Sequence, residues 1–263
     1  MSHYVIKLGG HALDSLEPDA PVLVALAEDL AALAREGHRV VVVHGGGPQI
    51  QALLDAVGLE SRFLDGLRVT DVATMEFVAM GLSQVNTHLV AALNQSGLAS
   101  VGLSGADAAT LHSSMLEESL GRVGATPKVD PDLIMTLWRA GLTPVLSPLA
   151  LDASGRLLNC NADTVAGCVA GAFGAVALLL LSDVDQLRAD PLDAASALRS
   201  VDGARVRQLL ENGAAREGMR PKMIAALDAL DGGAARVVVA NGTRPHAVRD
   251  ALAGTVPSTE VRA

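Results

Sequence analysis

The chain has 263 residues, of which 50% are hydrophobic and only 2% aromatic. This length is enough for one large core or two closely joined lobes, and the core must be built from Ala, Val and Leu. The net charge of −9 argues against a general binder of nucleic-acid phosphates, so we expect no nucleic-acid partner.

Targeting and membrane signals are missing from the sequence pattern. The longest apolar window covers about residues 175–181, far below the roughly 20 residues of a membrane span. The first apolar run begins at Tyr4, which leaves too little chain before it for a signal peptide. Cys160 and Cys168 match no zinc or redox spacing and are expected to be reduced thiols. We therefore expect a cytoplasmic protein with no membrane partner.

The first predicted element is a short apolar strand over residues 4–8, interrupted by Lys7 and followed directly by Gly9 and Gly10. A lysine inside a central strand is costly unless its ammonium group reaches a partner or a site at the carboxyl end of the strand. Taken alone, this segment is more typical of an edge strand with its lysine in solvent. A helix over residues 21–35 then leads to a second strand and completes a β-α-β unit.

The second strand is a run of valines over residues 40–43, followed by His44 and by glycines at 45–47. A segment that is apolar at every position is typical of a strand buried on both faces, in a parallel sheet covered by helices. Pro48 fits the first turn of a following helix. The glycines bring bare N–H groups beside that helix N-terminus, which either binds an anion or forms a tight turn without a ligand. The repeated pattern of a strand followed by glycines favours the first interpretation.

Arg68 is a lone cation in the apolar, glycine-containing segment 63–71. It is either an ordinary surface arginine or a clamp that binds a carboxylate through two parallel hydrogen bonds. After it the sequence predicts, in chain order, a helix over 72–95, a strand over 99–103, a helix from Pro131 to about residue 140, and a short or near-edge strand over 143–148.

The second half of the chain begins with a predicted hairpin over residues 151–158, which leads to the start of a helix. Asn159, Asn161 and Asp163 alternate at this helix start, although a single N-cap residue would suffice. The next apolar strand, about 175–181, is followed by acidic residues at its carboxyl end, where α/β proteins place ligands.

A helix is predicted over 201–211, and Lys222 lies in the first turn of another helix that runs to about residue 230. The helix dipole disfavours a cation at that position, which indicates a bound anion, and the alternative is a solvated lysine. A last strand over 236–240 and a short final helix complete the pattern. Strands that alternate with helices and show no linker predict an α/β fold in one domain, 1–263, with a lobe boundary near residue 150.

Eight segments of the chain match motifs of one known family. They are Ile6-Lys7-Leu8-Gly9-Gly10, Val43-His44-Gly45-Gly46-Gly47-Pro48-Gln49, Gly66-Leu67-Arg68-Val69-Thr70-Asp71, Val101-Gly102-Leu103-Ser104-Gly105, Leu120-Gly121-Arg122-Val123-Gly124, Asn159-Cys160-Asn161-Ala162-Asp163, Leu181-Ser182-Asp183-Val184 and Gly218-Met219-Arg220-Pro221-Lys222. Together they resemble the amino acid kinase family and, within it, the kinases of N-acetyl-L-glutamate. The third and sixth segments are the specific signals.

The resemblance implies a three-layer α/β/α sandwich around a mainly parallel sheet. Residues 1–150 would form an N-lobe that binds the acyl amino acid and dimerises, and residues 151–263 a C-lobe that binds ATP. The implied reaction is ATP-dependent phosphorylation of the side-chain carboxylate of N-acetyl-L-glutamate, the second step of arginine biosynthesis, with Mg²⁺ as cofactor and no metal site of the protein's own.

Carried over position by position, the resemblance implies that Lys7 and Lys222 flank the transferring phosphoryl group and that Asp163 orients them. The other implied contacts are Gly9, Gly10 and Gly46 for the phosphoryl group; Gly46, Gly47, Arg68, Asn159 and Asn161 for the acyl amino acid; and Asp183, Val184, Leu187, Arg216, Gly218 and Met219 for the nucleotide. The acceptor carboxylate, with a pKa of about 4.3, is already ionised, so no general base is needed. Alignment and charge neutralisation are then the main tasks of the site. His44 is interpreted as a structural hydrogen-bonding residue.

Some positions depart from the family pattern, and two other functions stay open. Gln186 stands where the family usually has glycine. The arginine-inhibited hexamers of the family carry an extra N-terminal helix, whereas the first predicted strand here begins at Tyr4, so we expect a homodimer that arginine does not inhibit. One alternative is a kinase for aminoadipate or glutamate bound to a carrier protein, in lysine or arginine biosynthesis. The other is a non-catalytic regulator that binds a small molecule with the same fold.

Overall fold

The structure, a computed structural model, describes residues 1–13, 15–190, 193–213 and 218–263. Its central sheet contains β1 (His3–Leu8), β2 (Arg39–His44), β5 (Ser100–Ser104), β8 (Thr143–Ser147), β11 (Ala177–Ser182), β12 (Ser200–Asp202), β13 (Val237–Asn241) and β14 (Ser258–Arg262). The strand order is β12-β14-β13-β11-β1-β2-β8-β5. All strands from β13 to β5 in this order run parallel, whereas β14 and β12 run in the opposite direction.

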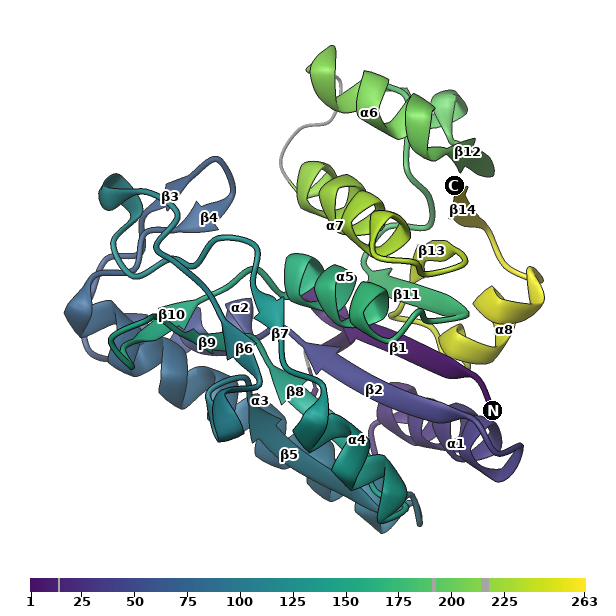
Figure 1. Ribbon diagram of the computed structural model, residues 1–263, viewed down its shortest axis with the longest axis horizontal. Coiled ribbons are helices and arrows are strands. Elements are labelled where there is room, and N and C mark those ends of the chain that lie inside the picture. The colour runs from purple at the N-terminus through teal and green to yellow at the C-terminus, as the bar shows by residue number, and fades with distance from the viewer. Residues whose placement is uncertain (14, 191–192, 214–217) are drawn as a thin grey trace.

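Helices cover both faces of this sheet, which gives three layers (Figure 1). They are α1 (Pro21–Arg35), α2 (Gly47–Ala56), α3 (Val72–Gln95), α4 (Asp132–Arg139), α5 (Ala162–Ala172), α6 (Gly203–Glu211), α7 (Met219–Asp231) and α8 (Ala247–Ala253). One core cluster joins the sheet to α4, α5, α6 and α7, and the other joins it to α1, α3 and α8. The predicted three-layer α/β/α sandwich with a mainly parallel sheet is confirmed.

The valine run of β2 shows why the sheet is buried on both sides. Successive residues of a strand point to opposite faces. Val41 and Val43 therefore pack in the first core cluster, and Val40 and Val42 pack in the second. Lys7 belongs to β1, which lies between β11 and β2, so it is in a central strand and the edge-strand alternative for this segment is wrong.

Short elements build a second region beside α2 and α3 (Figure 1). They are β6 (Leu111–His112), β7 (Lys128–Val129), β9 (Leu149–Leu151) and β10 (Leu157–Asn159) in a sheet of order β10-β9-β6-β7, and the hairpin of β3 (Phe63–Leu64) and β4 (Leu67–Arg68). Single turns of 3₁₀ helix are η1 (Gly10–Leu13), η2 (Asp107–Ala109), η3 (Glu118–Leu120) and η4 (Ala194–Ser196). The antiparallel pairing of β9 with β10 confirms the predicted hairpin.

The sequence-based prediction that the last strand lies at 236–240 is wrong, because β14 follows it. In β14 only the alternate residues Thr259 and Val261 are buried. Such a half-exposed antiparallel strand lacks the continuous apolar run that marks the buried parallel strands. Strand β12, which pairs in parallel with β14, also lacks a continuous apolar run, since only Val201 of its three residues is buried, and it was missed.

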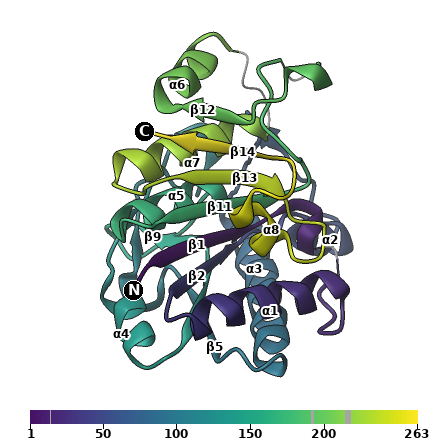
Figure 2. The same ribbon diagram turned by 90° about the vertical axis from the view of Figure 1, so that its right-hand side faces the viewer.

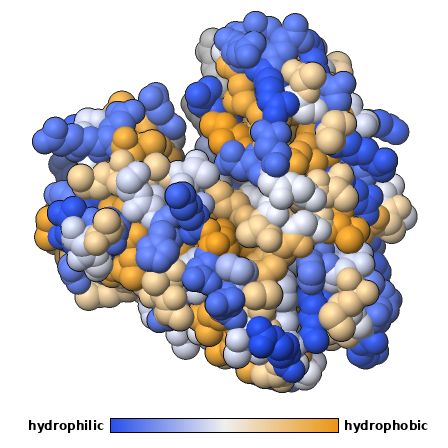
Figure 3. Space-filling model, viewed as in Figure 1, coloured by the Kyte–Doolittle hydropathy of each residue, from blue (hydrophilic) through white to orange (hydrophobic). Residues whose placement is uncertain are grey.

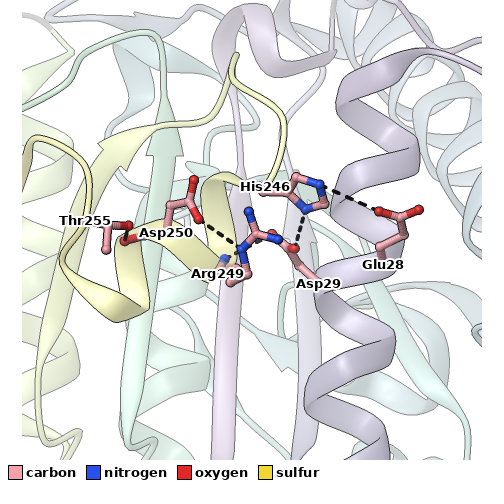
Figure 4. Close-up of polar contacts among 6 residues, drawn as sticks. All are labelled: Glu28, Asp29, His246, Arg249, Asp250 and Thr255. Carbon is pink, nitrogen blue, oxygen red and sulfur yellow. Dashed lines mark hydrogen bonds and ion pairs between the residues drawn. The ribbon is translucent and has the colours of Figure 1, made fainter.

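A buried carboxylate attaches α8 to α1 (Figure 4). Asp29, on α1, is 5% exposed and accepts hydrogen bonds from the backbone N–H of Arg249 at 3.0 Å and from Nδ1 of His246 at 2.8 Å. The first N–H groups of a helix have no intrahelical acceptor, and a negative charge is favourable beside them. Asp29 therefore caps α8 from a distant part of the chain, and Figure 2 shows α1 and α8 on the same side of the sheet. Within the described residues, no helix is long and apolar enough to span a membrane.

Candidate active site

Two lysines from distant parts of the chain meet at one aspartate. Lys7 lies near the carboxyl end of β1, and Asp163 and Lys222 lie in the first turns of α5 and α7. Nζ of Lys7 is 2.8 Å from Oδ1 of Asp163, and Nζ of Lys222 is 3.6 Å from Oδ2. Nζ of Lys222 also donates a hydrogen bond of 3.1 Å to the carbonyl oxygen of Gly218. The structure thus brings together all three residues predicted to be catalytic.

Close packing of α5 on α7 makes this meeting possible. A Cβ atom placed on Gly167 of α5 would lie 2.5 Å from the carbonyl oxygen of Ala225 on α7, so a larger residue would push the helices apart. Both helices begin beside the carboxyl end of β1, at the edge of the sheet where parallel α/β folds bind ligands. The glycine therefore helps to hold Lys222 within reach of Asp163.

The three charged groups are almost fully buried, with exposed fractions of 6% for Lys7, 5% for Asp163 and 8% for Lys222. Burial raises the pKa of the Asp163 carboxyl, but the two ammonium groups together outweigh that effect and hold the pKa below its usual range. Two buried cations around one anion leave an excess positive charge. Such an excess is unfavourable in a poorly solvated place unless an anion neutralises it. The cluster therefore has the charge of a site for an anionic ligand.

The lysines are also unusual in number. Lysine occurs at only three positions in the chain, 7, 128 and 222, although the sequence contains 20 lysines and arginines. Lys128 is exposed, whereas the two other lysines both lie at Asp163. A lysine is a compact point charge with three rotatable donors, whereas arginine presents a planar fork. The scarcity of lysine is a sequence signal that the motifs themselves do not carry.

Gly9 makes room for Lys7. A Cβ atom on Gly9 would lie 2.1 Å from Nζ of Lys7, so the lysine side chain folds over this residue. The N–H of Gly9 donates to the carbonyl oxygen of Leu181 at 3.1 Å, so it is already used in the sheet. The N–H of Gly9 is therefore not available for the predicted contact with a phosphoryl group. Gly10 follows directly and begins η1.

The second glycine segment has the predicted geometry of a strand, a turn and a helix. Gly45 donates to the carbonyl oxygen of Leu8 at 2.9 Å, Gly46 is the N-cap of α2, and Gly47 begins the helix. The N–H of Gly46 forms no hydrogen bond with any residue in the described ranges. A Cβ atom on Gly46 would lie 3.1 Å from Cδ2 of Leu82, so the backbone packs closely on α3.

The five residues predicted to bind the acyl amino acid all line one cleft of about 180 Å³: Gly46, Gly47, Arg68, Asn159 and Asn161. Phe63 of the β3–β4 hairpin also lines it, and Figure 3 shows the molecular surface hollowed between this hairpin and α7. Polar groups thus converge with apolar walls, as is typical of small-molecule sites.

Arg68 is oriented by neutral groups. It donates to Oε1 of Gln51 at 3.0 Å, to Oγ of Ser61 and to the carbonyl oxygen of Gly47 at 3.3 Å, and its guanidinium lies 4.7 Å from the centre of the Phe63 ring. Burial lowers the pKa of Arg68, an effect that Asp55 partly opposes. Among the described residues no carboxylate forms an ion pair with this buried guanidinium, which suits it to an incoming carboxylate.

The two asparagines near α5 differ in their contacts. Nδ2 of Asn159 donates to Oγ1 of Thr70 at 3.1 Å. Oδ1 of Asn161 accepts from the backbone N–H groups of Asp163 at 2.9 Å and Thr164 at 3.1 Å. Asn161 is therefore the N-cap of α5, and this local role also fixes the backbone of Asp163.

The residues predicted to bind the nucleotide are only partly brought together. Asp183 and Val184 are exposed after β11, and Gly218 and Met219 lie at the start of α7. Leu187 is fully buried in the core, and its N–H donates to Oγ1 of Thr259 at 2.9 Å. Leu187 therefore does not reach the surface. Arg216 lies outside the described residues.

The loop after β11 is fixed by contacts that the sequence did not reveal. Nε2 of Gln186 donates to the carbonyl oxygen of Ser258 at 3.0 Å, and Asp185 pairs with Arg244 at 3.0 Å. The unusual glutamine therefore attaches this loop to β14. In the described part of the chain, no group of three or more His, Cys, Asp or Glu side chains is arranged to hold a metal ion.

His44 is fully buried at the end of β2 and forms hydrogen bonds through both ring nitrogens. Nδ1 is 2.8 Å from the carbonyl oxygen of Gly45, and Nε2 is 3.0 Å from Nδ2 of Asn86 on α3. Burial lowers the pKa of His44 to about 4, and the hydrogen bond with Gly45 opposes this only in part. The interpretation of His44 as a structural hydrogen-bonding residue is confirmed. Asn86, in the middle of a long helix, was missed.

The fold is that of an α/β protein with an excess of positive charge at the carboxyl edge of its sheet. The sequence model described as the amino acid kinase family matches residues 3–241, and the chain belongs to this family. The acetylglutamate kinase of Symbiobacterium thermophilum is 40% identical over 254 residues, which cover 93% of this chain and 85% of that enzyme. The chloroplastic acetylglutamate kinase of Arabidopsis thaliana is 39% identical over 247 residues, which cover 93% of this chain and 70% of that protein.

Solved structures show the same fold. The crystal structure of smu.665 from Streptococcus mutans UA159 matches with a TM-score of 0.80 and 26% identity, covering 91% of this chain and 94% of that one. The carbamate kinase of Giardia lamblia bound to AMP-PNP matches with a TM-score of 0.69 and 17% identity, covering 99% of this chain and 98% of that one. The second likeness is one of fold alone.

We predict that His44 makes folding stability depend on pH. Its pKa is about 4 in the folded protein against 6.5 as the ordinary value, so the unfolded chain binds more protons between these values. The free energy of unfolding therefore falls as the pH drops from about 6.5 toward 4, by about 3 kcal/mol in all from this residue. Urea unfolding at a series of pH values measures this. His44→Gln removes this part of the slope, and the exposed His88→Gln is the control. Equal slopes for the two variants would contradict the prediction.

Proposed function

We propose that this chain transfers the γ-phosphoryl group of ATP to the side-chain carboxylate of N-acetyl-L-glutamate, giving N-acetyl-L-glutamyl 5-phosphate and ADP. This reaction is the second step of arginine biosynthesis. The observation that carries the proposal is the excess positive charge at Lys7, Asp163 and Lys222, next to a cleft in which no carboxylate of the described residues pairs with Arg68. The names of the relatives, about 40% identical over 93% of the chain, support it.

The charge of the cluster suits this reaction because both reactants are anions. An acceptor carboxylate has a pKa of about 4.3, so it is ionised at neutral pH and needs no general base. One carboxylate oxygen forms a bond to phosphorus, the bond from phosphorus to the ADP oxygen breaks, and that oxygen keeps the electron pair. Lys7 and Lys222 offset the repulsion between the anions and stabilise the charge on the moving phosphoryl group. Asp163 holds both ammonium groups in position.

The cleft supports binding of the acyl amino acid by five residues. Arg68 would bind the α-carboxylate through two parallel hydrogen bonds. Asn159 and Asn161, with the backbone of Gly46 and Gly47, would contact the remaining polar groups. The N–H of Gly46, at the N-terminus of α2, and the N–H of Gly10 would donate to the phosphoryl oxygens.

ATP would bind on the side of residues 151–263, and the acyl amino acid mainly on the side of residues 1–150. The exposed Asp183 and Val184 and the start of α7 support this placement. We propose that Mg²⁺ enters as part of the MgATP substrate, since this ion keeps several waters and binds mainly through phosphates. We also propose that the protein acts in the cytoplasm.

An assay of acyl phosphate formation with a panel of acceptors tests the proposal. Hydroxylamine traps the acyl phosphate product as a hydroxamate. We expect product with free N-acetyl-L-glutamate and not with free glutamate, which carries an extra positive charge at its amino group. The panel includes aminoadipate and glutamate attached to a carrier protein. Product from the carrier-bound substrates alone would favour the alternative kinase, and ATP and N-acetylglutamate binding without any product would favour a regulator.

We predict that Lys7→Met and Lys222→Met each lower kcat by about 10²–10³-fold and change the KM values much less. Both substitutions keep an apolar stem and remove charge that acts mainly in the transition state. The exposed Lys128→Met removes the only other lysine and is the matched control, with kcat expected within about twofold of the parent. Steady-state kinetics at saturating MgATP measure these values. Loss confined to KM would show that the lysines only bind substrate.

We propose a homodimer that forms through α3 in the N-lobe. Val72 and Met80 are 60% and 54% exposed, and a spacing of eight residues places them on the same face of this helix. We predict a dimer by light scattering and a monomer for Met80→Arg, because a charge on a buried interface is unfavourable. Val176→Arg, at an exposed residue away from α3, is the control. A parent protein that is monomeric, or a Met80→Arg variant that stays dimeric, would contradict this.

A further inference from the structure

We propose that His44 is a positioning residue, which holds the peptide between Gly45 and Gly46 so that the Gly46 N–H faces the transferring phosphoryl group. This role rests on the phosphoryl transfer proposed above. The reaction needs no proton transfer by a histidine, so His44 would act only by orienting this peptide. Asn86 would share the role, because it holds the His44 ring in place.

The contacts of His44 define which nitrogen carries the proton. The carbonyl oxygen of Gly45 can only accept, so Nδ1, at 2.8 Å, is the donor. Nε2 is then unprotonated and accepts from Nδ2 of Asn86 at 3.0 Å. Nδ2 of Asn86 also donates to the carbonyl oxygen of Val145 at 2.8 Å, so it uses both of its protons. The tautomer and the rotation of the ring are therefore both fixed.

The same hydrogen bond orients the Gly46 N–H. In a planar trans peptide the carbonyl oxygen and the N–H point in opposite directions. Because Nδ1 holds the Gly45 oxygen, the Gly46 N–H points away from the ring. Glycine on both sides offers no Cβ atom to resist rotation of this peptide. The flanking groups are fixed separately: the Gly45 N–H donates to Leu8, and the Gly46 oxygen accepts from the N–H of Ile50, each at 2.9 Å.

The surroundings keep this arrangement in place. A Cβ atom on Gly102 of β5 would lie 1.9 Å from Oδ1 of Asn86, so the strand leaves the space that the asparagine fills. His44 has no exposed surface, and its lowered pKa of about 4 keeps the ring neutral at physiological pH. A neutral ring retains the acceptor nitrogen that Asn86 needs. An unbroken chain of contacts thus runs from Gly102 of β5, through Asn86 of α3 and His44, to the carbonyl oxygen of Gly45.

Two substitutions at His44 separate this role from general stability. The amide of asparagine can place a donor near the position of Nδ1, whereas the amide of glutamine reaches the position of Nε2. We expect His44→Gln to lower kcat by about 10–100-fold and to leave both KM values within about twofold. The reason is that a misdirected Gly46 N–H would no longer stabilise the transition state, while ground-state binding depends on it much less. His44→Asn should keep kcat within about fivefold of the parent. Thermal unfolding shows whether both variants are folded.

The outcomes distinguish this proposal from the proposed function. A parent protein that forms no acyl phosphate with any acceptor would refute the phosphoryl transfer itself. An active parent with equal losses of kcat in the two folded variants, or with losses in KM alone, would overturn the role of His44 and leave the reaction standing. If neither variant folds, Asn86→Ala tests the same path, because the ring then loses the partner of Nε2. A folded Asn86→Ala variant with unchanged kcat would overturn the proposal.

Discussion

The ion pairs of Lys7 and Lys222 with the single carboxylate of Asp163 are the constraint on which the rest of the structure depends. The three groups come from β1, α5 and α7, and each is at most 8% exposed. Buried charges of one sign in excess are tolerated only where geometry is exact and a ligand completes the neutralisation. The strand order places β1 at the centre of the sheet, and the close contact of Gly167 with Ala225 keeps α5 and α7 together.

Glycines supply the space for these polar groups. Gly9 lies under the ammonium group of Lys7, and Gly102 lies against the amide of Asn86, each at a distance that a Cβ atom would forbid. In both cases the glycine is needed for close approach and not for a left-handed backbone. These two motif glycines therefore provide space for a neighbouring side chain and are not needed for backbone flexibility.

The sequence predicted the parts of the structure that leave local patterns. The buried valine run and the helix over 72–95 follow from apolar patterning and length, and Lys222 stood out because the helix dipole disfavours a cation in a first turn. Strand β14 and the burial of Leu187 depend on partners far away in the chain, so no local pattern marks them. The contact of Asn86 with His44 could not be predicted either, because a polar residue inside a long helix is usually solvent-exposed. Asn161 is the N-cap of α5, as its position at a helix start predicted, and it also lines the cleft.

The lobe boundary predicted near residue 150 would divide one continuous sheet. β1, before this boundary, and β11, after it, are paired in parallel from Tyr4 with Ala177 to Leu8 with Leu181. Helix α5, which carries Asp163, packs on this sheet in the core cluster that includes Val5 of β1, so Lys7 and Asp163 meet without a hinge. The β3–β4 hairpin lies outside this sheet, and its Phe63 is 58% exposed although the ring also contacts Arg68 at the cleft.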